Sequence, residues 1–392
     1  MEIIAFVVSI LESDPYKLKL LQMFLDNWDI SQINLSSTGT ALHHATLYHY
    51  SPVIELLLSH PEHPLDVNTV AGKFGTALQA AAVAQRKGEE QASLYTVELL
   101  VSRGANLSLT GGMKFSPLHA AVFERNTHIV KYLLSRMKSD DILRAGGEHG
   151  TVLQALLSRQ NDHWSEVDGE EDIGDNPDGV TEELFNCLLG HGESVMREGR
   201  PQDPSALHRA AQYASLRILE LVMKQPDVNI EKRDIMGRLP IRMAVRHSRD
   251  PWEIITTLDP ALSTLWEQDY QYRTVLHLAA GVGAIDVIRN ILNTKKKDGD
   301  GEAIEIVNRP DIHGWTPLHW ACRQSKWDVV ELLIEEGASK TARTDADWLP
   351  RHVAIHHDKT YYDDLPNDEE RSERDNDEAD YSMRRDQGSG DL

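Results

Sequence analysis

The feature that most constrains the fold is a sequence motif that recurs along the chain. The motif belongs to a repeat of about 33 residues, and most copies are separated by a few residues more than that. Its clearest copy is "GWTPLHWACRQSKWDVVELLIEEGA", residues 314–338. Residues equivalent to its first Leu stand at Leu42, Leu78, Leu118, Leu153, Leu207, Ile241, Leu276 and Leu318. Successive spacings are 36, 40, 35, 54, 34, 35 and 42 residues. Such a period is typical of a solenoid, in which each unit packs on its neighbours in sequence.

Each copy divides into two short helix patterns. In two copies the first pattern begins with Ser or Thr followed by Pro, at Thr316–Pro317 and Ser116–Pro117, and these residue types cap and start helices. The second has apolar residues on one face over about three turns, as in residues 53–60, 96–106 and 329–338. Gly104 and Gly337 follow two of these patterns and suit a helix C-terminal turn. One unit therefore cannot bury its apolar face alone, and stacked units can.

The motif resembles the ankyrin-repeat family. Residues 311–343 match it at Asp311, Gly314, Thr316, Pro317, Leu318, His319, Ala321, Val329, Val330, Leu332, Leu333, Gly337 and Ala338. The resemblance covers residues 35–357 in about nine units, and it implies an all-α solenoid of helix–turn–helix units with β-hairpin-like loops. The variants "GTALQAA" and "DADWLPRHVAI" resemble repeats of large ankyrin proteins from filamentous fungi.

Three copies depart from the family at the His of the motif. Gln79, Gln154 and Arg242 stand there instead. The resemblance implies a side-chain bond between this His and the preceding Thr, so whether an equivalent bond forms in these three copies is left open.

Other segments lie outside the regular units. Residues 1–34 lack the turn motif but hold a second-helix pattern, so we expect an N-terminal helical cap or a decayed repeat. Residues 161–180 form an acidic insertion, and residues 358–392 an acidic tail with thirteen acidic and five basic residues. Both are poor in apolar residues and dense in like charge, which predicts disorder.

The net charge of −22 comes mainly from these acidic segments. The body of the chain is close to neutral and has no cluster of Lys and Arg suited to phosphates, so we expect no nucleic-acid binding. Two cysteines exclude a disulfide framework. The apolar run at residues 3–11 is too short to span a bilayer and lacks the basic start of a signal peptide. The expected location is intracellular, cytoplasmic or nuclear, with no membrane association.

The histidines are the main candidates for chemistry, and most occupy one structural position. His43, His119, His208, His277, His319 and His352 all stand at the same place in successive units, where each is expected to bond locally. His352 and His356 are four residues apart but lack the further ligands of a zinc site. We find no phosphate-binding loop or nucleophile motif. The sequence therefore predicts no enzyme activity, no catalytic residue, no metal site and no cofactor.

The aromatic and arginine residues near the turns are candidates for partner binding, because Trp and Arg are frequent binding hot spots. In the family, the turn tip and the end of the first helix face a concave groove. The resemblance places Ile312, His313, Trp315, Arg323, Gln324, Arg343, Trp348, His356 and His357 on that groove. It places Tyr213, Arg238, Arg246 and Arg273 further along, where the arginines form a basic patch for an acidic partner segment or the chain's own tail. The alternatives are that Trp315 and Trp348 stack to cover the core, and that the arginines are solvated separately.

These observations favour a non-catalytic scaffold or adaptor that binds other proteins through the concave groove and the row of hairpins. We expect it to be monomeric. The alternative is a detached regulatory ankyrin region of a larger nucleotide-binding signalling protein or enzyme, which the fungal resemblance motivates.

Overall fold

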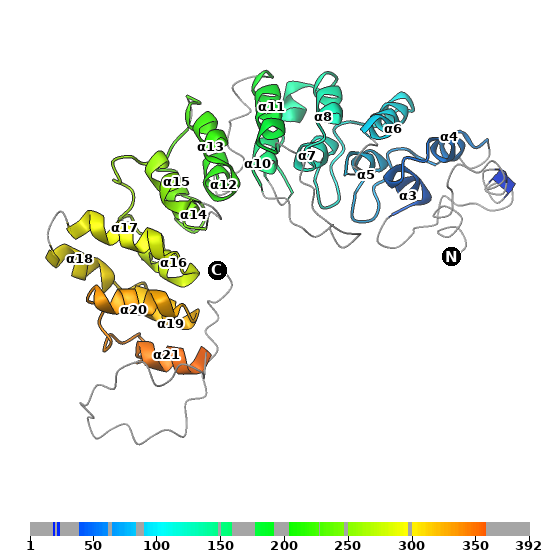
Figure 1. The fold of residues 1–392 in the computed structure, drawn as a ribbon. Helices are drawn as coiled ribbons and strands as arrows, with labels where there is room; N and C mark the ends of the chain where they lie inside the picture. Colours follow the sequence, from blue (N-terminus) through cyan, green and yellow to red (C-terminus); the bar gives the residue numbers. More distant parts are fainter. Residues whose placement is uncertain are drawn as a thin grey trace.

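The structure is a computed structural model, and it describes residues 19, 22–23, 39–61, 65–83, 90–147, 150–158, 177–191, 204–226, 228–246, 250–296 and 300–357. Figure 1 shows the described helices stacked in pairs along a curved array. The first helices of the pairs are α3 (Ala41–Leu47), α5 (Ala77–Val83), α7 (Pro117–Phe123), α10 (Val152–Leu156), α12 (Ala206–Tyr213), α14 (Pro240–Ala244), α16 (Val275–Val282), α19 (Pro317–Arg323) and α21 (Pro350–His357). The second helices are α4 (Ser51–Ser59), α6 (Glu90–Ser102), α8 (Thr127–Leu134), α11 (Pro177–Leu189), α13 (Leu216–Met223), α15 (Pro251–Leu258), α17 (Ile285–Lys296) and α20 (Trp327–Glu335). Two further helices, α9 (Ser139–Ile142) and α18 (Asp300–Val307), lie in the connections that follow α8 and α17.

The first helices form the inner, concave side of the array and the second helices the outer side (Figure 1). Each first helix packs on the next, as α3 does on α5 and α16 on α19, and it also packs on the second helix of its own pair. The described residues contain no β-strand, and isolated bridges occur at turns, as between Ala71 and Gly75 and between Gly146 and Gly150. The prediction of an all-α ankyrin solenoid is confirmed.

The core is a continuous strip between the two helix rows. In each unit the Leu of the motif is buried, as are the apolar residues of the second helix; Leu118, Ile129 and Leu133 have no exposed surface. Alanines such as Ala120 and Ala121 let adjacent inner helices approach closely. Because no single unit has a complete core, the burial of each depends on its neighbours.

The ends of the second helices confirm the roles expected for two glycines. Gly104 and Gly337 both have φ of +89°, in the left-handed region where a side chain is unfavourable. The amide of Gly104 donates to the carbonyl of Val101, and that of Ala105 to the carbonyl of Leu100, which closes the helix.

Adjacent turns are joined by backbone hydrogen bonds. The amide of Tyr270 donates to the carbonyl of Met236 at 3.2 Å, and the amide of Ile312 to that of Gln271 at 2.9 Å. These bonds fix the register of successive turn tips, so the tips form a row along the concave edge.

The segment boundaries are only partly visible in the structure. The acidic insertion falls between α10 and α11, and its residues 161–176 lie outside the described residues, as do 358–392 and nearly all of 1–34. Helix α11 begins at Pro177, so residues 177–180, predicted as the end of a disordered insertion, are helical. Pro at the first helical position is favourable there because no amide bond is lost. Among the described residues, no helix has both the length and the apolar character needed to cross a membrane.

Candidate functional site

The histidines of the motif connect neighbouring units. In every unit that has this His, except the last, the ring bonds at Nδ1 with the Ser or Thr before its helix, and Nε2 faces a carbonyl oxygen of the next turn. His43 lies 2.8 Å from Gly75 O, His208 2.9 Å from Arg238 O and His319 3.1 Å from Trp348 O. Since a carbonyl can only accept, Nε2 carries the proton. Nδ1 accepts the backbone amide of the cap residue in His43, His208, His277 and His319, so these rings are neutral.

Burial keeps these histidines neutral. It lowers the pKa of His119 to about 4, that of His319 to about 4 and that of His277 to about 3, and for His277 the charge of Arg242 lowers it further. No group of three or more His, Cys, Asp or Glu in the described part of the chain is arranged to hold a metal ion. The bonds from each ring to the cap and to the next turn make these histidines hydrogen-bonding links between units.

Glutamine reproduces both bonds of the histidine. Gln79 accepts the amide of Thr76 at 2.7 Å and donates to Gly111 O at 2.8 Å. Gln154 does the same with the amide of Thr151 and the carbonyl of Pro204. A bond equivalent to the one between His and Thr therefore forms at Gln79 and Gln154. The amide oxygen replaces Nδ1 and the amide nitrogen replaces Nε2.

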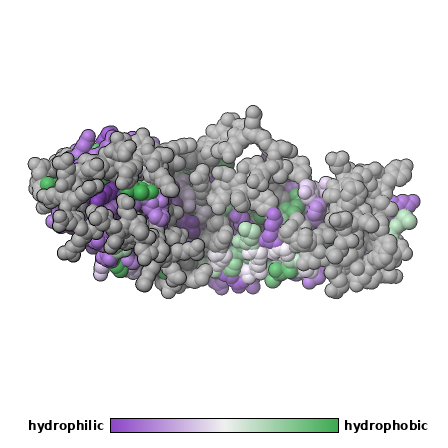
Figure 2. Space-filling view, turned by 90° about the horizontal axis from the view of Figure 1, so that it is seen from below, coloured by the Kyte–Doolittle hydropathy of each residue, from purple (hydrophilic) through white to green (hydrophobic). Residues whose placement is uncertain are grey.

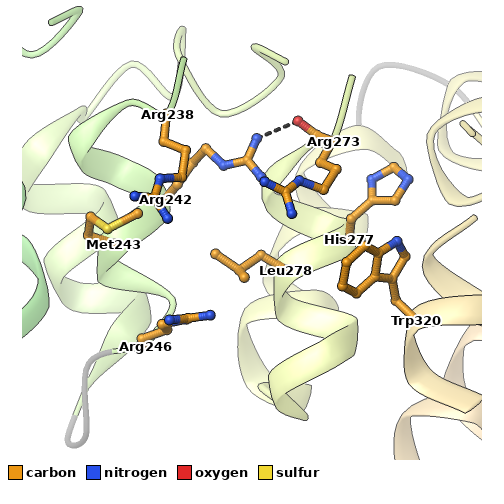
Figure 3. A pocket seen from close by; sticks show the side chains of 8 residues that line it. All are labelled: Arg238, Arg242, Met243, Arg246, Arg273, His277, Leu278 and Trp320. Atoms are coloured by element: carbon orange, nitrogen blue, oxygen red, sulfur yellow. Dashed lines mark hydrogen bonds between the residues drawn. The ribbon is translucent and has the colours of Figure 1, made fainter. Parts of the chain in front are cut away.

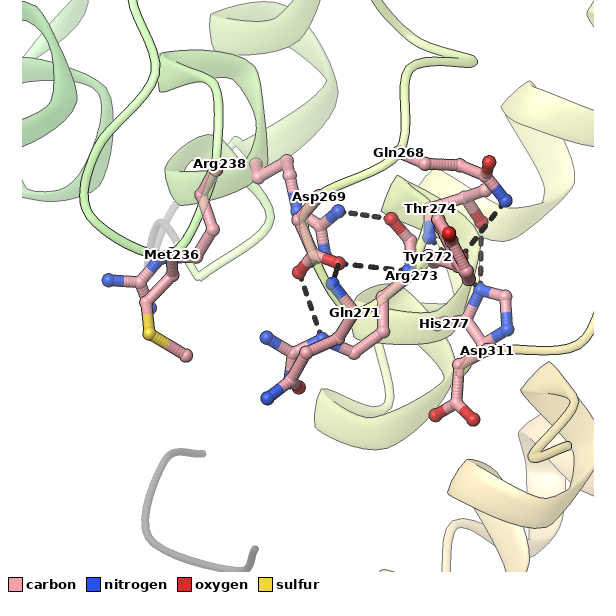
Figure 4. A network of polar contacts seen from close by, with 12 residues as sticks. Met236, Arg238, Gln268, Asp269, Gln271, Tyr272, Arg273, Thr274, His277 and Asp311 are labelled. Carbon is pink, nitrogen blue, oxygen red and sulfur yellow. Dashed lines mark hydrogen bonds and ion pairs between the residues drawn. The ribbon is translucent and has the colours of Figure 1, made fainter. Parts of the chain in front are cut away.

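Arg242 keeps only the connection to the next unit. Its Nη1 donates to Arg273 O, while Leu239 stands at the capping position and provides no side-chain cap. Its Nη2 lies 3.2 Å from Asp269 Oδ2, which Arg273 Nε also contacts at 2.9 Å. Figure 4 shows the part of this network around Asp269, whose Oδ1 accepts the amides of Gln271 and Arg273. The side chains of Arg242 and Asp269 are 3% and 0% exposed, so the pair is buried.

Four arginines surround a small pocket on the concave side, between α14, α16 and α19. The lining residues are Arg238, Arg242, Met243, Arg246, Arg273, His277, Leu278 and Trp320 (Figure 3). We call this the arginine pocket. The predicted basic residues Arg238, Arg246 and Arg273 are thus brought together, which counts against their being solvated separately. Arg242 and Trp320 were not predicted as site residues; the only sequence signal was the Arg at a His position.

The aromatic candidates form two clusters. Trp315 lies 6.1 Å from Trp320 between ring centroids, and the Arg323 guanidinium lies 5.5 Å from the Trp315 ring. Trp348 contacts the ring of His356 at 5.7 Å, which in turn contacts His357. Burial, followed by the charges of His356 and Arg323, lowers the pKa of His357. Both tryptophans also pack against the core, so they combine a structural role with a half-buried aromatic face.

The remaining predicted residues lie at several places on the concave side. Gln324 caps the C-terminus of α19, and Tyr213 ends α12 and is exposed. Arg343 is exposed and pairs with Asp347 at 2.9 Å. The backbone carbonyl of His313 accepts the amide of Asp345 from the next turn.

Large apolar side chains are exposed at the tips of three consecutive turns. Ile235, Tyr270 and Ile312 each follow a turn aspartate and are 61%, 63% and 45% exposed. Only Ile312 was predicted as a contact residue. In Figure 2, which shows one face of the molecule, the visible described residues mix hydrophilic and hydrophobic side chains. The hydrophobic residues visible on this face form small separate areas. The three turn tips are held in one row by the backbone hydrogen bonds that join adjacent turns.

The fold and these surfaces define a class: a curved helical-repeat protein with a concave side and an adjoining row of turn tips. The family model for three consecutive ankyrin repeats matches residues 255–344, and that for a single ankyrin repeat matches residues 113–144. The chain belongs to the ankyrin-repeat proteins. Ankyrin repeats generally mediate protein–protein interaction and are typically non-catalytic.

Several curated proteins are similar to the chain. Ankyrin repeat domain-containing protein SAT10 of Stachybotrys chartarum is 28% identical over 343 residues, which are 87% of this chain and 16% of that protein. The probable E3 ubiquitin-protein ligase XBOS33 of Oryza sativa is 28% identical over 174 residues, 36% of this chain and 33% of the relative. Human scaffold protein ILK is 40% identical over 53 residues, 12% of each chain. The chain thus spans 16% of the length of SAT10 and 33% of that of XBOS33.

Proposed function

We propose that the chain is a non-catalytic scaffold or adaptor that binds partner proteins through the turn-tip row and the adjoining groove. The observation that carries this proposal is the exposed apolar series Ile235, Tyr270 and Ile312 on three consecutive, hydrogen-bonded turns. Exposed apolar side chains held in a fixed register present a surface that a partner can cover with little ordering cost. The groove beside them adds Trp315 and Arg323, residue types frequent in hot spots.

The test compares two surface variants in cells that express the chain. Replacing Ile235, Tyr270 and Ile312 by Ser is expected to reduce the recovery of specific partners at least tenfold, measured by quantitative affinity mass spectrometry. The matched control replaces Tyr95 and Ile304, equally exposed but located on α6 and α18, and is expected to leave recovery within twofold.

A second variant separates the groove from the tips. Replacing Trp315, Arg323 and Trp348 by Ala removes the aromatic groove residues, with circular dichroism used to confirm that the variant is folded. Partners recovered at wild-type levels with both the tip and the groove variants would contradict the proposal.

The alternative, a regulatory region of a larger protein, is favoured by one observation: 87% of the chain aligns with only 16% of SAT10. A transcript that joins this reading frame to a nucleotide-binding or catalytic domain would support it. Under either proposal we expect a monomeric array, located inside the cell, that binds proteins and not nucleic acid.

A further inference from the structure

We propose that the arginine pocket is a binding site for carboxylate groups and that its occupant is the acidic segment of the same chain, residues 358–392. This goes beyond the proposed function, because it assigns a ligand chemistry and an intramolecular partner to a site that the tip row does not include.

The charge of the pocket is positive. Four guanidinium groups line it, and two buried carboxylates, Asp234 and Asp269, lie behind them. Asp234 pairs with Arg238 at 2.7 Å, and Asp269 pairs with Arg273 and Arg242. Backbone amides of the two turns occupy the other oxygen of each aspartate. The formal charges of these four guanidinium and two carboxylate groups therefore sum to +2.

One donor in the pocket wall has no acceptor. Within the described residues, Nε of Arg242 is buried and makes no hydrogen bond. Its side chain is 3% exposed and lines the pocket (Figure 3). A buried donor without an acceptor costs about 1–3 kcal/mol, more when it belongs to a charged group. A carboxylate oxygen that enters the pocket is the type of acceptor that offsets this cost, and it would also meet a complementary charge.

The rest of the wall strengthens an ionic contact. Trp320 and Leu278 form an apolar side of the pocket, and the ring of Trp320 lies 5.8 Å from the guanidinium of Arg273. Apolar walls reduce the local dielectric constant, so opposite charges attract more strongly there than at an open surface. The neighbouring His277 is neutral and does not compete with the arginines.

The acidic segment starts close enough to reach the pocket. It follows His357, the last residue of α21, and α21 packs on α19, which packs on α16. The axes of packed helices are about 10 Å apart, so the distance from α21 across α19 to α16 is roughly 20 Å. A flexible chain of about a dozen residues has that end-to-end distance, and Asp368, Glu369 and Glu370 stand at this spacing after His357. Attachment to the same chain gives an effective concentration on the order of millimolar.

The test uses the full chain and a fluorescent synthetic peptide with the sequence of residues 358–392. In the receiving chain, the thirteen acidic residues of that segment are replaced by Asn or Gln, which empties the pocket without shortening the chain. Fluorescence anisotropy at low salt is expected to show micromolar binding to this neutralised chain. Binding to the wild-type chain is expected to be at least tenfold weaker, because its own segment competes.

Single substitutions then locate the site. In the neutralised chain, Arg246→Gln and Arg238→Gln are each expected to weaken peptide binding at least fivefold. Arg289→Gln is the matched control, an exposed arginine on the outer helix α17, and is expected to change binding less than twofold. Absence of binding to the neutralised chain, equal binding to the wild-type chain, or equal effects of Arg246→Gln and Arg289→Gln would each overturn the proposal. None of these variants alters Ile235, Tyr270 or Ile312, so failure of the partner-binding proposal would be recognised separately.

Discussion

Replacing Arg242 by Ala is expected to lower the free energy of unfolding by about 3 kcal/mol, among the largest losses available to a single polar substitution in this chain. The side chain makes the ion pair with buried Asp269 and donates to the carbonyl of Arg273, and both partners would lose a contact inside the core. Breaking one side of a buried pair is costly because the remaining charge cannot be solvated. Urea denaturation followed by circular dichroism measures the loss, and hydrogen exchange should localise it to α14 and α16.

Two further variants separate this explanation from a general effect of removing an arginine. Arg343→Ala breaks an ion pair with Asp347 whose side chains are 53% and 67% exposed, so a change of at most about 0.5 kcal/mol is expected. The double variant Arg242→His with Leu239→Thr restores the usual residues of the motif and should recover at least half of the loss. Equal stability of the Arg242→Ala and Arg343→Ala variants would refute the role assigned to the buried pair.

The sequence was sufficient to predict the fold because the determinants of an ankyrin unit are local. The cap at Thr316, the Pro at the first helical position and the left-handed Gly337 lie within one 33-residue stretch. Each unit packs only on its neighbours, so recognising the repeat also predicts the tertiary contacts. The same logic placed Trp315 and Arg323 beside each other, since both belong to one turn and the helix that follows it.

The arginine pocket was only half predictable because its residues come from three units. Arg238, Arg246 and Arg273 were placed near one another by their equivalent positions, but Arg242 was recognised only as a departure from the motif. Its partner Asp269 lies in the next unit, and the insertions between motifs hide that register. The tips Ile235 and Tyr270 were missed for another reason: a sequence pattern does not distinguish an apolar side chain that faces solvent from one that packs on the next turn.

Glutamine at the histidine position suggests how to reduce the loss of stability of this fold at low pH. Unfolded histidines bind protons near pH 6.5, whereas burial lowers the pKa of His119 and His319 to about 4 and that of His277 to about 3. The folded state therefore binds fewer protons below pH 6.5, so the stability contributed is complete above that pH and is lost as the pH falls. Each histidine contributes a slope approaching about 1.4 kcal/mol per pH unit. Together the three should remove on the order of 5 kcal/mol between pH 6.5 and 5.

Glu124 acts in the opposite direction. Burial raises the pKa of its carboxyl to about 7, above the unfolded value of 4.5, so its effect favours the folded state as the pH falls from 7 to 4.5. It should offset about 2 kcal/mol of the histidine effect between pH 6.5 and 5. The net loss expected from these four groups over this interval is therefore about 3 kcal/mol, and the lowered pKa values of His43, His44 and His357 add to it.

The triple variant His119→Gln, His277→Gln and His319→Gln should keep both hydrogen bonds of each link, as Gln79 and Gln154 do in the natural chain. Its stability, measured by urea denaturation from pH 7.5 to 5, should fall much less with decreasing pH than that of the wild type. Among the residues that the structure describes, the remaining histidines with a lowered pKa are His43, His44 and His357, and Glu124 opposes their effect. The matched control is His128→Gln, an exposed histidine on α8, which should leave the wild-type pH dependence unchanged. The glutamine side chain does not bind a proton in the folded or the unfolded state. A triple variant that loses stability as steeply as the wild type would therefore show that the buried histidines are not the source of the acid sensitivity.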